Sequence, residues 1–147
     1  MPHSLIKSGE FEGWHTWEHE PFEHDLVGPF AFRVDEQGPV SAFRAEHRHM
    51  NGGGVMHGGC LMTFADFALF GIAHEHMGED VYGLTVAFSS EFLDGPKVGE
   101  YIEARGEVLR AGGSLIFVRG IVTADGRSCL SFSGTIKKAR KDKMDKK

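Results

Sequence analysis

The chain has 147 residues, of which 41% are hydrophobic, 11% aromatic and 25% charged, and its formal net charge is −5. This composition is typical of a single globular domain with one core, and two cysteines are too few for a disulfide framework. The first ten residues, MPHSLIKSGE, lack the apolar stretch of a signal peptide, and no apolar run is long enough to span a membrane. We therefore expect a cytoplasmic protein.

Charge is distributed unevenly along the chain. Residues 137–147 hold seven of the 16 Lys and Arg, so residues 1–136 carry nine cations and 19 anions, a net charge of −10. A basic tail can bind nucleic acid, but this one contains no aromatic residue for stacking and follows an acidic body. We interpret residues 139–147 as a basic disordered tail that aids solubility, and we expect no nucleic-acid partner.

The first half of the chain predicts two strands and one helix. Residues 1–24 combine His, Glu and aromatic residues without a clear period, which indicates irregular structure or a short helix. Strands are expected at Phe30–Val34 and Val40–His47. After a glycine-rich loop, Cys60–Ala73 is apolar on nearly every side and predicts a buried helix that ends near Gly78.

Every segment after the helix predicts β-structure, with strands at Leu84–Phe92, Tyr101–Leu109, Ser114–Ala124 and Ser128–Ile136. Because the strands come in a run, we expect an α+β fold in which one long central helix is wrapped by a five- to six-stranded, mostly antiparallel sheet. One sheet covers only one side of an apolar helix, so a partner subunit is expected to cover the rest.

Asp66 is an isolated acid in the predicted helix. Its helical neighbours three and four residues away are Met62, Thr63, Leu69 and Phe70, none of which is charged. An unpaired carboxylate in apolar surroundings costs several kcal/mol, roughly, unless it is protonated, partnered or solvated in a cleft. It is either a structural acid with a hydrogen bond across the core, or a general base or nucleophile whose pKa is raised by burial.

The sequence His57-Gly58-Gly59 lies directly before the helix. Unblocked amides at a helix N-terminus can hold an oxyanion, an interaction worth roughly 3–4 kcal/mol in a transition state. The alternative is that these glycines only permit a tight loop. Asp66 opposite such donors, without a Ser-His-Asp set, favours hydrolysis of an activated ester. No phosphate-binding fingerprint is present.

Metal and thiol chemistry are both disfavoured. The nine histidines include pairs at spacing two, such as His47 and His49, but no H-E-x-x-H or C-x-x-C motif, so we expect no metal site. Cys60 lies near a helix N-terminus, which can lower a thiol pKa, but neither Cys60 nor Cys129 has an obvious paired base.

The combined pattern is Asn51, five residues, His57-Gly58-Gly59, six residues and Asp66, followed by Gly83-Leu84-Thr85-Val86 and then FLDGPKVGE at residues 92–100. It closely resembles the hotdog-fold acyl-CoA thioesterases, and in particular the PaaI-like (phenylacetic acid degradation-related) branch. The resemblance covers residues 26–138, which we take as the domain, and leaves residues 1–25 as an N-terminal extension.

The resemblance implies a role for each residue of the pattern. Asp66 would be the general base or nucleophile, and the Gly58 amide would polarise the thioester carbonyl. Asn51 and His57 would position the thioester or the attacking water. Thr85 stands where the family has a Ser or Thr that holds the water or the carboxylate.

The resemblance also implies an assembly and a substrate. Two subunits would share active sites at their interface, and dimers would pair into homotetramers. The substrate would be an acyl-CoA, hydrolysed to a carboxylic acid and coenzyme A with no separate cofactor, and we expect Lys97, Arg105 and Arg110 to contact the coenzyme A phosphates. The alternatives are a non-catalytic acyl-CoA-binding hotdog protein and a dehydratase acting on 3-hydroxyacyl thioesters.

Overall fold

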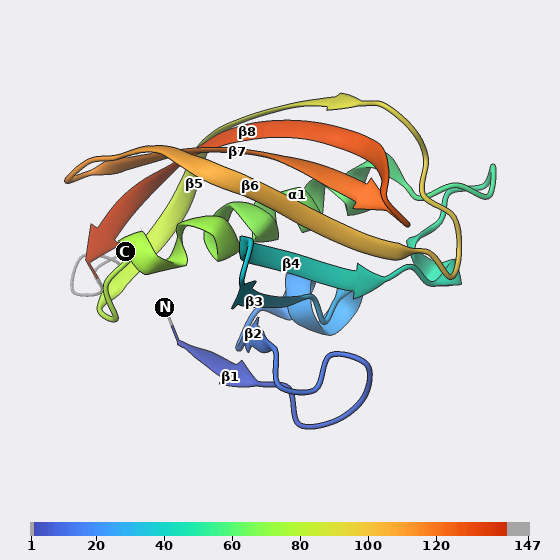
Figure 1. The fold of residues 1–147 in the computed structure, drawn as a ribbon, viewed down its shortest axis with the longest axis horizontal. Coiled ribbons are helices and arrows are strands. Elements are labelled where there is room, and N and C mark those ends of the chain that lie inside the picture. Colours follow the sequence, from blue (N-terminus) through green and yellow to red (C-terminus); the bar gives the residue numbers. More distant parts are fainter. Residues whose placement is uncertain (1, 141–147) are drawn as a thin grey trace.

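One antiparallel sheet curves around one long helix in the computed structural model, which describes residues 2–140 (Figure 1). The strands are β1 (His3–Leu5), β2 (His15–Trp17), β3 (Ala31–Asp35), β4 (Gly38–Arg44), β5 (Val81–Phe92), β6 (Tyr101–Ala111), β7 (Leu115–Ala124) and β8 (Arg127–Arg140). The helix is α1 (Gly58–Ala73), and the short helical segments are η1 (Pro21–Val27, π-type), η2 (His47–His49) and η3 (His74–His76), both 3₁₀. Residues 141–147 of the expected tail lie outside the described residues, whereas 139 and 140 belong to β8.

The sheet has eight strands in the order β1-β2-β3-β4-β6-β7-β8-β5, and all its pairings are antiparallel. The α+β prediction is confirmed, and β3 and β5 to β8 lie within a few residues of the predicted strands. The predicted strand Val40–His47 is too long at its end, because β4 ends at Arg44 and His47–His49 form η2. The sheet is larger than expected because the N-terminal region contributes β1 and β2, which pair through His3 and Trp17. Each of these strands is only three residues long, too short for an alternating pattern to appear in the sequence.

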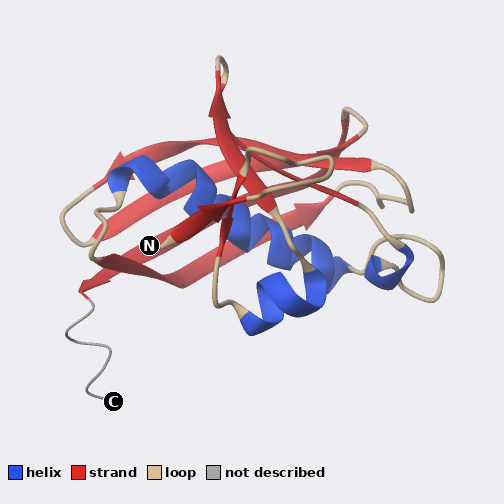
Figure 2. Ribbon diagram, turned by 90° about the horizontal axis from the view of Figure 1, so that it is seen from below, coloured by secondary structure: helices blue, strands red, loops and turns tan. Residues whose placement is uncertain are grey.

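The second half of α1 forms the centre of the core. Residues 67–73 are all buried, and the helix runs across one face of the sheet (Figure 2). Sheet and helix approach closely: a Cβ added at Gly134 on β8 would lie 2.5 Å from Leu69 Cδ1. A side chain at this position would displace the Leu69 side chain, so glycine allows this close packing of α1 on β8.

The N-terminal region is packed into the fold. Trp17 is buried and stacks on Phe32 with ring centroids 4.4 Å apart, and both belong to the main core. The segment η1, light blue in Figure 1, packs against α1. The protein's own first 30 residues therefore cover part of α1, and cover by a partner subunit stays a prediction.

β5 is an edge strand with an apolar outer surface. Its residues Leu84 and Val86 are 48% and 54% exposed, and Phe92 at its end is 54% exposed. A long, apolar, unpaired edge is a surface on which another strand can pair.

Among residues 2–140, no helix is long and apolar enough to cross a membrane.

Candidate active site

Asp66 is held by a residue from the edge strand. Thr85 Oγ1 on β5 donates a hydrogen bond of 2.6 Å to Asp66 Oδ1. Burial raises the pKa of Asp66 above its ordinary value, and the hydrogen bond from Thr85 opposes this shift because it stabilises the ionised carboxylate. Asp66 and Thr85 belong to the same sequence pattern but are 19 positions apart in the chain, and the fold brings their side chains into contact.

The N-terminus of α1 presents a free amide. The His57 ring caps the helix, since its Nδ1 accepts a hydrogen bond of 2.8 Å from the Gly59 amide. Within the described part of the chain, the Gly58 amide has no hydrogen-bond acceptor. A Cβ at Gly58 would lie 3.2 Å from the Phe92 ring, so the absence of a side chain at Gly58 leaves room for this ring. The Gly58 N–H is therefore available to an oxyanion.

Asn51, in the glycine-rich loop before α1, and His57, at the helix N-cap, each retain unused hydrogen-bond donors. Asn51 Oδ1 accepts hydrogen bonds from the Gly53 and Val55 amides, at 2.8 and 3.3 Å, which shapes the glycine-rich loop and leaves the side-chain NH₂ group exposed. Because His57 Nδ1 is an acceptor, the proton of the neutral ring is on Nε2. Both residues can thus donate hydrogen bonds to a ligand.

These residues form two half-sites within one protomer. Gly58 and Asp66 are eight residues apart on α1, which is about 12 Å along the helix axis. A single thioester carbonyl cannot contact both. We call Asp66 with Thr85 the first candidate half-site, and Asn51, His57 and Gly58 the second, or His57, half-site.

A cleft of about 470 Å³ lies over Asp66. Its walls are Met62 and Thr63 of α1, Phe88 of β5, and Glu20, Phe22 and Glu23 from the N-terminal region. A second hollow, of about 360 Å³, extends along η1 to His57 and Gly59 and shares Phe22 and Thr63 with the cleft.

Sequence reasoning missed the two acids of this wall. Burial, together with the charges of Glu20 and Asp66, raises the pKa of Glu23 to about 8. The burial of Glu23 could not be predicted from the residues around it in the sequence, because Glu23 is buried only when η1 packs against α1.

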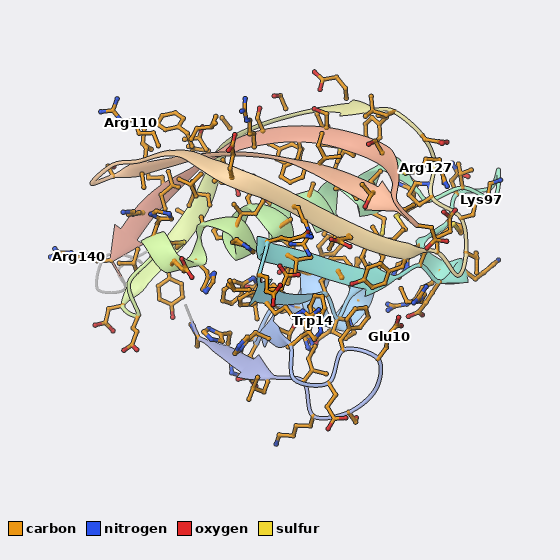
Figure 3. All side chains as sticks on the ribbon, viewed as in Figure 1. Glu10, Trp14, Lys97, Arg110, Arg127 and Arg140 are labelled. Atoms are coloured by element: carbon orange, nitrogen blue, oxygen red, sulfur yellow. The ribbon has the colours of Figure 1, made fainter. Side chains whose placement is uncertain are left out.

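The three expected phosphate-binding cations are not close together. Arg105 is engaged by Asp35, with hydrogen bonds of 2.5 and 3.0 Å, and by Glu103. Lys97 and Arg110 lie at opposite ends of the molecule (Figure 3). Lys97 follows Pro96, whose carbonyl accepts a hydrogen bond from the Met56 amide, so Lys97 is on the side of the His57 half-site.

The thiols and histidines offer no alternative centre. Burial raises the pKa of Cys60 to about 11, the opposite of what a nucleophilic thiol needs. Within residues 2–140, no three His, Cys, Asp or Glu side chains are grouped so that they could hold a metal ion.

Comparison with solved structures identifies the architecture. The chain resembles a hypothetical thioesterase protein of Streptococcus pneumoniae crystallised with coenzyme A, with 19% identity and a TM-score of 0.68 over 81% of this chain and 93% of that one. It resembles the E. coli PaaI protein of the phenylacetic acid degradation operon, with 19% identity and a TM-score of 0.60 over 75% of this chain and 72% of that one. A Bacillus halodurans protein, BH2602, crystallised with coenzyme A, gives 20% identity and a TM-score of 0.68 over 74% of this chain and 73% of that one. The fold is therefore the hotdog fold.

Sequence comparison then assigns the family. Residues 53–130 match the family model of the thioesterase superfamily. A protein of Pseudomonas aeruginosa named "Putative esterase PA0474" is 35% identical over 112 residues, which are 75% of this chain and 83% of that protein. The chain belongs to the thioesterase superfamily, and the predicted family resemblance is confirmed.

Proposed function

We propose that this thioester hydrolase acts on acyl-CoA and releases a carboxylic acid and free coenzyme A. The proposal rests on one arrangement in the structure. Thr85 orients the Asp66 carboxylate in a cleft, and the Gly58 amide at the start of the same helix is free among the described residues. The related fold of the S. pneumoniae protein, crystallised with coenzyme A, supports coenzyme A as the thiol component of the substrate.

Each half-site supplies one part of the chemistry. Asp66 acts as general base towards water, or as nucleophile, and the Thr85 hydrogen bond orients its carboxylate and opposes the rise in pKa that burial causes. The Gly58 amide stabilises the developing oxyanion, which is worth roughly 3–4 kcal/mol in the transition state. The free donors of Asn51 and His57 position the thioester or the water.

Two copies of the chain would join these half-sites. Pairing of β5 with β5 of a second copy would bury Leu84 and Val86 and bring one protomer's Asp66 towards the other's Gly58. We further propose that such dimers pair into a homotetramer. A cytoplasmic location is supported by the two cysteines, which are both free.

Of the three expected cations, Lys97 is the best placed for the coenzyme A phosphates, because it is exposed on the side of the His57 half-site. Arg105 is committed to Asp35 and Glu103, so we assign it a structural role. A phosphate contact by Arg110 remains a prediction.

The dehydratase alternative needs a histidine paired with a carboxylate, whereas the side-chain partner of Asp66 among the described residues is Thr85.

The function is tested by measuring thiol release, with a chromogenic disulfide, from acetyl-, hexanoyl-, palmitoyl- and benzoyl-CoA. Wild type should release thiol from at least one of them. Asp66→Asn should reduce kcat on the order of 10²-fold or more while remaining folded. Asp25→Asn, an exposed acid paired with His24, is the matched control and should retain full activity. A wild-type protein that binds acyl-CoA without releasing thiol would instead be the acyl-CoA-binding alternative.

A further inference from the structure

Glu23 projects from η1 into the cleft that contains Asp66. The two carboxyl groups come from different elements, and both line the same hollow with Phe22, Met62 and Phe88. The charged groups that face Glu23 are Glu20, at the start of η1, and Asp66 on α1, while β5 presents the apolar Phe88. Glu23 therefore lies among other acids and apolar surfaces, in a cleft wide enough for a substrate.

Asp66 and Glu23 differ in what stabilises their charged forms. Asp66 accepts the hydrogen bond of Thr85, which favours the carboxylate. Within residues 2–140, Glu23 has neither a side-chain hydrogen bond nor an ion pair, so nothing compensates its charge, and its pKa is raised to about 8. Burial raises the pKa of both groups, but only Asp66 has a hydrogen bond that opposes the rise, so the two environments suit Asp66 as the base and Glu23 as the acid. Asp66 is the base of this pair, and Glu23 carries a proton at neutral pH.

The segment that carries Glu23 is fixed in place. Arg48 donates hydrogen bonds to the carbonyls of Leu26 and Gly28, and His49 Nε2 donates to the intervening Val27 carbonyl at 2.7 Å. The Glu46 amide donates to His49 Nδ1 at 3.0 Å, which leaves the ring proton on Nε2. Three successive carbonyls at the end of η1 are thus bonded to η2, and Glu23 is held over the cleft.

We propose that Glu23 is the proton donor of this cleft and protonates the sulfur of the leaving coenzyme A while Asp66 takes the proton of the attacking water. This inference rests on the proposed thioesterase function. The water oxygen forms a bond to the carbonyl carbon, the C–S bond breaks with its electron pair on sulfur, and that sulfur receives the Glu23 proton. Proton transfer from Asp66 to Glu23 through solvent then restores both groups. The products are the carboxylic acid and the coenzyme A thiol.

The test compares two leaving groups with the same acyl group, namely benzoyl-CoA and S-(4-nitrophenyl) thiobenzoate. 4-Nitrothiophenol is much more acidic than an alkyl thiol and leaves without a proton. Glu23→Gln keeps the shape and polarity of the protonated acid but cannot transfer a proton. It should reduce kcat on benzoyl-CoA on the order of 10²-fold and leave kcat on the nitrophenyl thioester close to wild type. Glu23→Asp should recover part of the loss, and Asp25→Asn, on the same segment, should change neither rate.

The pH profile gives a second readout. Wild-type kcat on benzoyl-CoA should fall above about pH 8 as Glu23 loses its proton, and Glu23→Gln should lack this alkaline fall. Equal losses on the two leaving groups, or an alkaline fall that persists in Glu23→Gln, would overturn the proton-donor role. Wild type that releases thiol from none of acetyl-, hexanoyl-, palmitoyl- and benzoyl-CoA would instead refute the proposed function, and this inference with it. If another of these acyl groups is the one hydrolysed, it replaces benzoyl in both thioesters. Far-ultraviolet circular dichroism of each variant checks that the fold is retained.

Discussion

The hydroxyl of Thr85 donates a hydrogen bond of 2.6 Å to Asp66 Oδ1, and this bond joins the central helix to the free edge of the sheet. The strand that orients the carboxylate, β5, is also the one with an exposed apolar edge. Orientation of Asp66 and the proposed pairing with a second copy therefore depend on the same strand. Any displacement of β5 would move the hydroxyl away from the carboxylate.

Thr85→Val should move the acidic limb of the pH–kcat/KM profile to higher pH. The hydrogen bond favours ionised Asp66, so its loss raises the Asp66 pKa further above its ordinary value. A hydrogen bond to a charged group contributes about 1.5–3 kcal/mol, which corresponds to a shift of about 1–2 pH units. Thr85→Ser retains the hydroxyl and should retain the wild-type limb. An unchanged limb in Thr85→Val would mean that Asp66 does not control it.

Val86→Lys should convert the oligomer to monomers. The side chain is 54% exposed in a single copy, and a buried, unpaired ammonium at a strand-to-strand interface is costly. Sedimentation velocity measures the change in mass, and thiol release should fall with it because the half-sites separate. Leu5→Lys, at the opposite edge of the sheet and 55% exposed, is the control. An active Val86→Lys monomer would show that one copy contains a complete site.

The sequence predicted the elements whose signals are long or local. Alternation of apolar and polar residues in Tyr101–Leu109 indicated β6, glycine-containing turns on either side indicated β7, and the apolar run indicated α1. It did not predict β1 and β2, because three-residue strands are formed by contacts such as the Trp17–Phe32 stack. Tertiary packing decides structure of this kind, so no local pattern records it.

The residues of the candidate site also divide into those with a local sequence signal and those without one. Asp66 and Gly58 could be selected from the sequence, because an acid in an apolar helix and a glycine at a helix start are unusual for physical reasons. Glu23 could not, because a glutamate in a polar N-terminal segment resembles a solvated surface residue until η1 packs on α1. Arg105 resembled a ligand-binding cation, yet Asp35 pairs with it from 70 residues away.

Lys97→Ala should raise KM for acyl-CoA severalfold and leave kcat nearly unchanged, because an exposed phosphate contact contributes equally to ground-state and transition-state binding. The same acyl group on pantetheine, which lacks the nucleotide phosphates, should show no change in KM. Arg105→Met should lower the free energy of unfolding without changing KM, since its partners are Asp35 and Glu103. A raised KM in Arg105→Met with unchanged stability would reverse the two assignments.

Arg48→Ala should destabilise the protein by about 1.5–3 kcal/mol, since a charged donor to two backbone carbonyls is lost. Urea unfolding measures the change. Arg119→Ala is the matched control: its ion pair with Glu107 is exposed, and such pairs contribute about 0–1 kcal/mol. Equal effects in the two variants would show that the bonds from Arg48 do not hold η1 in place.

Glu23→Gln should flatten the dependence of stability on pH. The folded-state pKa of Glu23, about 8, lies above the ordinary value of 4.5, so the folded state binds its proton more tightly than the unfolded state does. The resulting stability is fully present below pH 4.5 and is lost as pH rises through about 8. Wild type should therefore lose stability relative to Glu23→Gln across this interval, as measured by urea unfolding at several pH values. Asp25→Asn should keep the wild-type slope. Parallel curves for wild type and Glu23→Gln would show that Glu23 is already ionised in the folded protein at neutral pH, and it could not then serve as the proton donor.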